Sequence, residues 1–348
     1  MKTPTFKHLT ASTIIAMGIS TTPVIAEPTV AISGAVEVEI NSGEDHTAST
    51  KGSDIALATV EIGIDAQINE NVSAHVLILH EDDDTDPPVI DEGTITISKG
   101  SLFLNAGRMY IPFGNFESNM ISDPLTLELA ETQEAAIEFG YEANGLRASI
   151  YAFNGEADQV TSNPNPDNDV VDDFGISIGY TMKAGNMNLD FGFDYLNNMA
   201  ETDGMEGVLL SGPTVEEHTA GMALHAIINM DALTVILEHV TAADDFNILD
   251  ADFNGAKASP SATNIELAYN MKMGEREYTF AIAHQSTSDM DPVNIGLPES
   301  VNLFSVTTTL AKDVGFIVEY SDASDYETAD GGSGKSGSML TAQLAVEF

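Results

Sequence analysis

The sequence lacks cysteine and tryptophan altogether, and it is very poor in cationic side chains. Without cysteine, the chain can form no disulfide framework, no thiolate metal site and no cysteine nucleophile. Only 12 Lys and Arg residues stand against 55 Asp and Glu residues, which gives the 348-residue chain a formal net charge of −43 at pH 7. Nucleic acid is therefore excluded as a partner, because phosphate recognition needs clusters of Lys and Arg.

Long apolar runs are also missing beyond the start of the chain. There, a basic start (Lys2, Lys7) precedes a mostly apolar run over 9–19 and small residues at 24–26. This pattern predicts a signal peptide over 1–26 that is cleaved after Ala26, with an uncleaved N-terminal anchor as the alternative. No later run of eighteen apolar residues exists, so membrane-spanning helices are not expected.

The last residues alternate between two faces. Leu340, Leu344 and Phe348 lie on one face, and Thr341 and Gln343 lie on the other. A final amphipathic strand ending in Phe resembles the signal that the barrel assembly machinery of Gram-negative bacteria reads. With the leader, this ending predicts export to the bacterial outer membrane, with Phe348 as the contact to that machinery.

The same period of two runs through the rest of the chain, as expected for strands with one apolar face. Each alternating segment is bounded by turn residues. Sixteen strands are expected, near 30–40, 54–66, 71–80, 91–98, 102–110, 134–142, 146–153, 172–181, 187–196, 218–229, 232–241, 262–271, 277–286, 300–310, 314–321 and 338–348.

The connections between these segments alternate strictly between tight turns, such as Asn144-Gly145, and long acidic loops. Asn-Gly is a preferred hairpin pair, and short periplasmic turns with long external loops are typical of bacterial barrels. In the segment 187–196, Phe191 and Phe193 would face lipid, while Asp190 and Asp194 would face a wet interior. Strands in lipid must close on themselves to pair every backbone group. We therefore predict an all-β fold, a transmembrane antiparallel up-and-down β-barrel of about 16 strands, over 27–348 and without a plug domain.

One long connection, 111–133, is far too apolar for a free loop in water. It would be the third external loop, and Asp123 before Pro124 is typical of a helix start, with Asp as N-cap and Pro at the first helical position. We predict a partly helical segment that folds into the barrel and narrows the pore. A cap packed over the rim of the barrel is the alternative.

Two of the few cations flank this segment. Arg147 points inward on the alternation of its strand, and Arg108 lies on the strand that leads into the segment. Either arginine could pair with nearby carboxylates and set a transverse field in the pore, or form plain structural ion pairs. The candidate residues for pore constriction and selectivity are Arg108, Arg147, Phe113, Phe116, Glu117, Asp123, Glu128 and Glu131.

Other patterns are weaker. Acidic loops at 81–86 and 163–169 could hold divalent cations or bridge surface lipid through such ions, but the better interpretation is that they are solvated loops. The histidines show no paired metal-ligand spacing, and Ser286 near His284 offers no specific catalytic arrangement. We therefore expect no enzyme activity, no catalytic residue, no metal and no cofactor.

Four stretches of the sequence are distinctive. They are Gly107-Arg108-Met109-Tyr110-Ile111-Pro112-Phe113-Gly114-Asn115-Phe116, the run from Met120 to Leu129, Glu131-Thr132 and Tyr151-Ala152-Phe153-Asn154-Gly155. Together they resemble the signature of the legiobactin-uptake (LbtU) type of siderophore porins. This resemblance covers about fifty residues. It implies a sixteen-stranded outer-membrane barrel that takes up a ferric siderophore passively, without the plug of TonB-dependent receptors.

Three functions stay open at this point: a porin for a ferric siderophore, a general or cation-preferring diffusion porin, and a structural or adhesive barrel. The expected partners are a ferric siderophore or small solutes, together with outer-membrane lipid and lipopolysaccharide.

Overall fold

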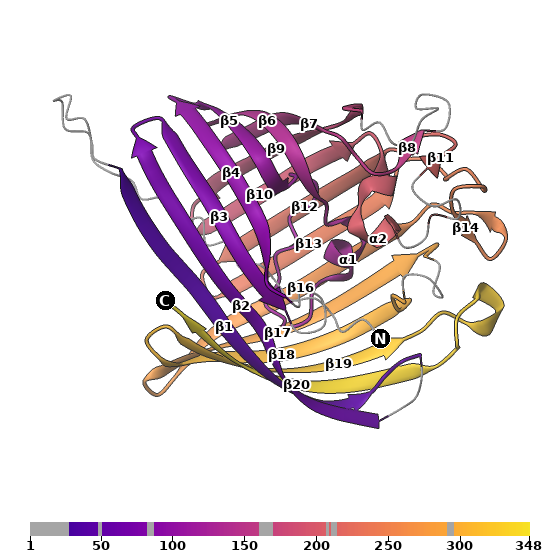
Figure 1. Ribbon diagram of the computed structural model, residues 1–348. Helices are drawn as coiled ribbons and strands as arrows, with labels where there is room; N and C mark the ends of the chain where they lie inside the picture. Colours follow the sequence, from indigo (N-terminus) through magenta and orange to yellow (C-terminus); the bar gives the residue numbers. More distant parts are fainter. Residues whose placement is uncertain are drawn as a thin grey trace.

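The computed structural model is a closed barrel of sixteen antiparallel strands (Figure 1). The structure describes residues 28–47, 51–81, 87–159, 170–206, 209, 214–290 and 296–348. The barrel strands are β1 (Thr29–Glu44), β2 (Lys51–Asn69), β3 (Val72–Glu81), β4 (Val89–Lys99), β5 (Leu102–Tyr110), β6 (Gln133–Ala143), β7 (Leu146–Phe153), β9 (Asp173–Ala184), β10 (Met187–Leu196), β12 (Gly221–Met230), β13 (Leu233–Ala242), β16 (Ser261–Met273), β17 (Arg276–Ser288), β18 (Ser300–Ala311), β19 (Val314–Ser324) and β20 (Ser336–Glu347). The predicted fold class and strand number are confirmed.

The long connections carry the remaining elements. These are α1 (Leu125–Ala130), α2 (Asp203–Glu206), the 3₁₀ turns η1 (Met199–Glu201) and η2 (Thr328–Asp330), and four two-residue strands, β8 (Asp158–Gln159), β11 (Thr214–Val215), β14 (Asp252–Phe253) and β15 (Ala256–Lys257). In the part of the chain that the structure describes, no helix is long and apolar enough to cross a membrane.

The barrel closes where β20 pairs with β1. Ala35 lies opposite Glu347, and Gly34 and Phe348 exchange two backbone hydrogen bonds of 3.0 Å each. The ring of Phe348 lies over Gly34, where a β-carbon would fall 2.6 Å from the ring. This closure leaves no free sheet edge in lipid, where unpaired backbone groups cost several kcal/mol each. The role of Phe348 in assembly stays a prediction.

Seven two-residue turns join the strands at one end of the barrel, at 70–71, 100–101, 144–145, 185–186, 231–232, 274–275 and 312–313. Asn144 (φ 55°) and Gly145 (φ 83°) both have positive φ, as the hairpin turn predicted from their sequence requires. The first strand begins and the last strand ends at this same end, because Thr29 lies opposite Gln67, next to the turn at 70–71. This is the arrangement of short turns and long loops expected for a bacterial barrel.

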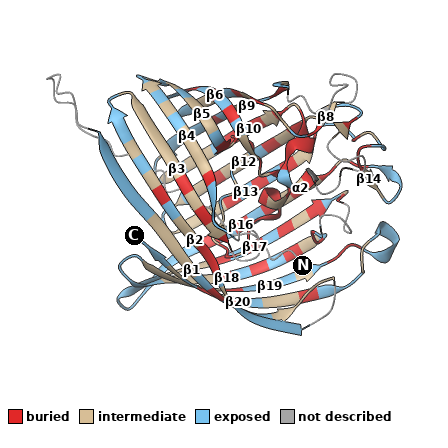
Figure 2. Ribbon diagram, viewed as in Figure 1, coloured by how far each residue is buried: buried red, intermediate tan, exposed pale blue. Residues whose placement is uncertain are grey.

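The outer face of the wall is apolar, and the inner face is polar. Ile137, Phe139 and Ile150 are exposed on the outside, whereas Glu138 and Tyr151, which alternate with them, are buried inside. Figure 2 shows that buried residues gather around α1 and α2 inside the barrel, whereas β1 is mostly exposed or intermediate. The core of this protein therefore lies between the inner wall and the segments that fold against it.

Some predictions fall on residues outside the described ranges. They are the predicted signal peptide over 1–26 and most of the acidic clusters at 81–86 and 163–169. The signal peptide and the divalent-cation sites therefore stay predictions.

Candidate functional site

The connection between β5 and β6 enters the barrel and returns to its starting point. Its neck is closed by a backbone hydrogen bond from Ile111 N–H to the carbonyl of Thr132 (3.0 Å). Within it, α1 packs against the inner faces of β13, β16 and β17 (Figure 1). The expectation of an inward-folded, partly helical third loop is confirmed. We call residues 111–132 the inserted segment.

Carboxylates on the opposite wall bind the backbone of the inserted segment. Glu238 on β13 accepts hydrogen bonds from the N–H groups of Asn115 (2.6 Å) and Phe116 (3.1 and 3.2 Å to its two oxygens). Its second oxygen also accepts the hydroxyl of Thr126 (2.7 Å). Asp194 on β10 accepts the N–H of Gly114 (3.1 Å). A hydrogen bond to an ionised acceptor is worth about twice a neutral one, so these contacts hold the first half of the segment against the wall.

The same pattern continues along the segment. Glu266 on β16 accepts both the backbone N–H (2.8 Å) and the side-chain amide (2.6 Å) of Asn119. Glu319 on β19 accepts the N–H of Ile121 (2.5 Å) and the hydroxyl of Ser122 (2.5 Å). From Gly114 to Ser122 the segment therefore contacts β10, β13, β16 and β19 in turn, so it runs across the barrel wall and is not a free loop.

The start of α1 differs from the prediction. Pro124, not Asp123, occupies the N-cap position, and it makes no side-chain capping hydrogen bond. The N–H of Leu125, one of the first-turn donors without an intrahelical partner, instead donates to the side-chain oxygen of Gln285 on β17 (3.1 Å). Gln285 of the barrel wall therefore replaces the N-cap side chain, and the expected capping role of Asp123 is wrong.

Apolar side chains fill the space between the segment and the wall. Phe113 is 1 % exposed, and it packs in one cluster with Met120, Leu125 and Leu129 from the segment and with Met199 and Met205 from the connection after β10. Burial of each such side chain contributes roughly 1.5–3 kcal/mol. The backbone of Gly204 in α2 lies so close to α1 that a β-carbon would fall 2.3 Å from the carbonyl of Glu128. The segment is therefore packed as well as hydrogen-bonded.

The remaining candidates in the segment take different positions. Glu117 is exposed, Phe116 is partly buried with a left-handed backbone (φ 58°), and Asp123 is buried. Glu128 and Glu131 are half-buried. Of the eight predicted residues, the six in the segment do lie together, with Glu117 among those that remain accessible.

Arg147 lies on the inner face, where it pairs with a wall residue. Its guanidinium contacts Asp190 on β10 at 2.8 Å and donates to the hydroxyl of Thr181 (2.7 Å). His225 on β12 lies 3.6 Å from the same carboxylate. Two glycines make room for these side chains, because a β-carbon at Gly192 would fall 2.3 Å from the His225 ring and one at Gly179 would fall 2.8 Å from the Arg147 guanidinium. The carboxylate partner of Arg147 therefore lies in the wall and not in the inserted segment.

Arg108 lies on the other face of the wall. It stands opposite Ala135, which shares the outer face of β6 with the exposed Ile137 and Phe139, and its Nε donates to Gln133 (2.7 Å). The buried Met109, next to it, is the residue that faces the inside. The expectation that Arg108 points into the constriction is therefore wrong, because a one-residue step along a strand reverses the face.

The inner wall is also acidic away from the inserted segment. Glu37 and Glu39 on β1, Glu61 and Asp65 on β2 and Glu138 on β6 alternate with outward apolar residues. Several have neutral partners, since Gln343 donates to Glu39 (2.8 Å) and Asn105 donates to Glu138 (2.8 Å). Of the three arginines, all in described strands, Arg147 alone faces inward. Lys99, Lys183, Lys272 and Lys312 lie at or beside the two-residue turns.

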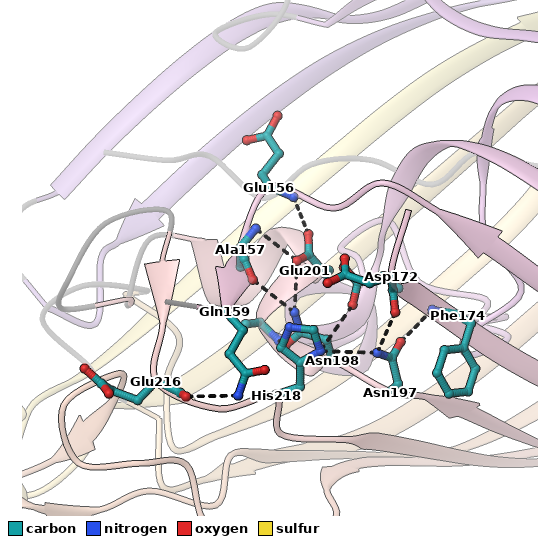
Figure 3. A network of polar contacts seen from close by, with 12 residues as sticks. Glu156, Ala157, Gln159, Asp172, Phe174, Asn197, Asn198, Glu201, Glu216 and His218 are labelled. Carbon is teal, nitrogen blue, oxygen red and sulfur yellow. Dashed lines mark hydrogen bonds and ion pairs between the residues drawn. The ribbon is translucent and has the colours of Figure 1, made fainter. Parts of the chain in front are cut away.

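A second polar network lies among the long connections, beside α2 (Figure 3). Glu201, in η1, accepts the N–H groups of Glu156 (2.7 Å) and Ala157 (2.9 Å) and the side-chain amide of Asn198 (3.0 Å). Burial, followed by the nearby charge of Asp173, raises the pKa of Glu201 to about 7. This network joins the connection after β7 to the one after β10, and it stabilises the external end of the barrel next to the inserted segment.

Within the described ranges, no group of three or more His, Cys, Asp or Glu side chains is placed to hold a metal ion. Ser286 and His284 share the outer face of β17, and His284 contacts Asn302 (2.9 Å).

The family model of Gram-negative porins matches residues 11–321 of the chain. The chain belongs to the Gram-negative porin family. It is an outer-membrane channel without enzyme activity, as its sequence predicts. Among solved structures, it is similar to the anion-selective porin from Comamonas acidovorans (TM-score 0.64, 12 % identity, 92 % of this chain and 100 % of that one). It is also similar to the channel DcaP of Acinetobacter baumannii (TM-score 0.61, 12 % identity, 92 % and 97 %).

Relatives by sequence are distant but span most of this porin. It is 26 % identical to the UPF0422 protein lpl2888 of Legionella pneumophila (strain Lens), over 94 % of this chain and 68 % of the relative. It is 25 % identical to a UPF0422 protein of Coxiella burnetii, over 94 % and 74 %.

The residues that hold the inserted segment are absent from the candidates chosen by sequence. Glu238, Glu266, Glu319 and Gln285 lie on strands more than 100 residues away from it. The signal in the sequence is a carboxylate on the inner face of a strand beside apolar inner-face residues, as Glu238 is between Ile236 and Val240. Such a pattern indicates that the carboxylate has a binding partner on the inner wall, but it does not identify that partner.

Proposed function

We propose that this porin is a diffusion channel that prefers cations and that the inserted segment forms its constriction. The observation that supports this proposal most is the negative charge of the inner wall. Carboxylates line β1, β2, β6 and β10, while Arg147, the inward-facing arginine, is already matched by Asp190. A channel that is lined by charges of one sign and has low-dielectric walls concentrates counter-ions. Cations should therefore pass more readily than anions of the same size.

The test is a reversal-potential measurement on the purified porin in a planar bilayer with a KCl gradient. We expect the sign of potential that a K⁺-permeable channel gives, and we expect the preference to weaken at high salt, where surface charges are screened. A preference for Cl⁻ would contradict the proposal. The anion-selective porin from Comamonas acidovorans shares the fold, so fold alone does not decide the outcome.

A second candidate substrate is a ferric siderophore. The supporting observation is that the residues resembling the legiobactin-uptake type of siderophore porins, from Gly107 to Thr132, largely coincide with the inserted segment. On an acidic wall, a neutral or cationic ferric chelate would be favoured over an anionic one. Iron-siderophore uptake in a knockout strain complemented with the intact gene tests this idea. Restored uptake without the TonB energy system supports it, whereas restored permeability to small solutes with unchanged iron uptake leaves only the diffusion porin.

A further inference from the structure

Arg108 is a charged side chain on the lipid-facing side of the wall. It lies two residues before the external end of β5, and Tyr110, at that end, shares its outer face. Within the described part of the chain, Arg108 has one side-chain hydrogen bond, through Nε to Gln133, and no ion pair. A cation facing lipid is costly unless it reaches an anion at the membrane interface. The two terminal nitrogens of the guanidinium therefore need an anionic partner.

Three strands hold this side chain in place. Asp91, at a bulge in β4, accepts the side-chain amide of Gln133 on β6 (2.8 Å) and lies 3.4 Å from the hydroxyl of Tyr110. This contact turns the side-chain oxygen of Gln133 toward Arg108 Nε (2.7 Å). The Arg108 side chain is therefore held by a chain of hydrogen bonds through Gln133 to Asp91 and is not a free surface arginine.

The space beside the guanidinium is open. Arg108 stands between Gly93 on β4 and Ala135 on β6, and a β-carbon at Gly93 would meet nothing within 4 Å. Arg108 itself is an exposed residue among the described parts of the wall. An anion at the level of the strand end can approach its terminal nitrogens from the membrane side, and a guanidinium fork suits the paired oxygens of a phosphate.

We infer that Arg108, held by Gln133 and Asp91, binds a phosphate group of a lipid in the outer leaflet of the outer membrane. The chain carries a net charge of −43 and would otherwise repel anionic lipid. A fixed cation on the outer face gives such a lipid a specific point of attachment. The inference concerns the outer surface and goes beyond the proposed pore function.

The test compares three forms of the porin purified from outer membranes: wild type, Arg108→Gln and Arg276→Gln. Arg276 is a matched control, because it is an exposed, outward-facing arginine at the opposite end of the barrel. Heat-modifiable migration in SDS gels shows that each form is folded. Native mass spectrometry and phosphorus assay then give the retained lipid and the oligomeric mass.

We expect Arg108→Gln to retain several-fold less phosphorylated lipid than the wild type and Arg276→Gln to retain the wild-type amount. Equal retention by Arg108→Gln would overturn the inference. So would an altered oligomeric mass with unchanged lipid, which would assign Arg108 to a contact between copies of the chain.

A binding measurement on delipidated wild-type protein adds a result that does not depend on any variant. Lipid A should bind about tenfold more tightly than its dephosphorylated form, which corresponds to one strong charged contact. Equal binding of the two lipids would contradict a phosphate site. Competition by inorganic phosphate alone, with no preference for lipid A, would show that the site takes free phosphate and would overturn the lipid assignment.

Discussion

The carboxylate of Glu238 receives the backbone N–H of Phe116 between its two oxygens, at 3.2 and 3.1 Å, across 122 positions of sequence. Phe116 has a left-handed backbone (φ 58°), a conformation that a bulky residue adopts only when its surroundings enforce it. Asn115 and Thr126 donate to the same carboxylate. Glu238 therefore fixes both the beginning of the inserted segment and the helix α1 that follows.

Replacement of Glu238 should loosen the inserted segment. Hydrogen bonds to a charged group contribute roughly 1.5–3 kcal/mol each, so Glu238→Ala removes several of them, while Glu238→Gln keeps a neutral acceptor. In single-channel recordings we expect more open-channel noise and a higher mean conductance, with alanine having the larger effect. Asp65→Asn, on β2 away from the segment's contacts, is the control and should alter ion preference without added noise. Quiet, wild-type recordings from Glu238→Ala would show that the segment is held without this residue.

The strands could be predicted closely from sequence, because an apolar outer face and a polar inner face impose a period of two. The expected strands 146–153 and 187–196 coincide with β7 and β10. The outward face of Arg108 follows from the same alternation, because Arg108 shares its face of β5 with Leu102 and Leu104. The partners of Glu238 could not be found, because the donors are backbone N–H groups and leave no mark in the sequence.

Loss of Asp190 should leave Arg147 uncompensated on the inner wall. Asp190→Asn removes one negative charge and so the ion pair with the guanidinium, and the local field becomes positive. We expect the cation preference, measured as a reversal potential, to fall toward that of a nonselective channel. Thr181→Ala removes the neighbouring hydroxyl without changing charge and should leave the potential unaltered. If both variants behave alike, the charge of Arg147 has no influence on permeation.

The glycine at position 192 should be required by His225. A β-carbon there would lie 2.3 Å from the imidazole ring, so Gly192→Ala forces the ring or the strand to move. Overpacking of this kind costs roughly 1–3 kcal/mol. We expect the folded band in SDS gels to be lost at a lower temperature. The double variant Gly192→Ala/His225→Ala should recover most of the loss, and no recovery would mean that the strain lies in the backbone.

Glu201 should make the external network sensitive to pH. Its pKa is raised from 4.5 to about 7, so the folded state holds the proton more tightly than the unfolded state. The resulting stabilisation is complete below about pH 4.5 and is lost as the pH rises through about 7, roughly 3 kcal/mol at most. Hydrogen exchange of the Ala157 amide, corrected for its intrinsic rate, should show protection falling over this window. Glu201→Gln should abolish the pH dependence, and an unchanged profile would assign it to another group.

The central claim is that the inserted segment lines the narrowest part of the pore, and thiol blocking tests it directly because the chain has no cysteine of its own. Asn115→Cys places a thiol on an exposed position of the segment, and Ala135→Cys places one on the outer face of β6. A bulky thiol reagent added to a single open channel should reduce the conductance of Asn115→Cys in one step and leave Ala135→Cys unchanged. Complete labelling of Asn115→Cys, verified by mass, with no change in conductance would contradict the claim.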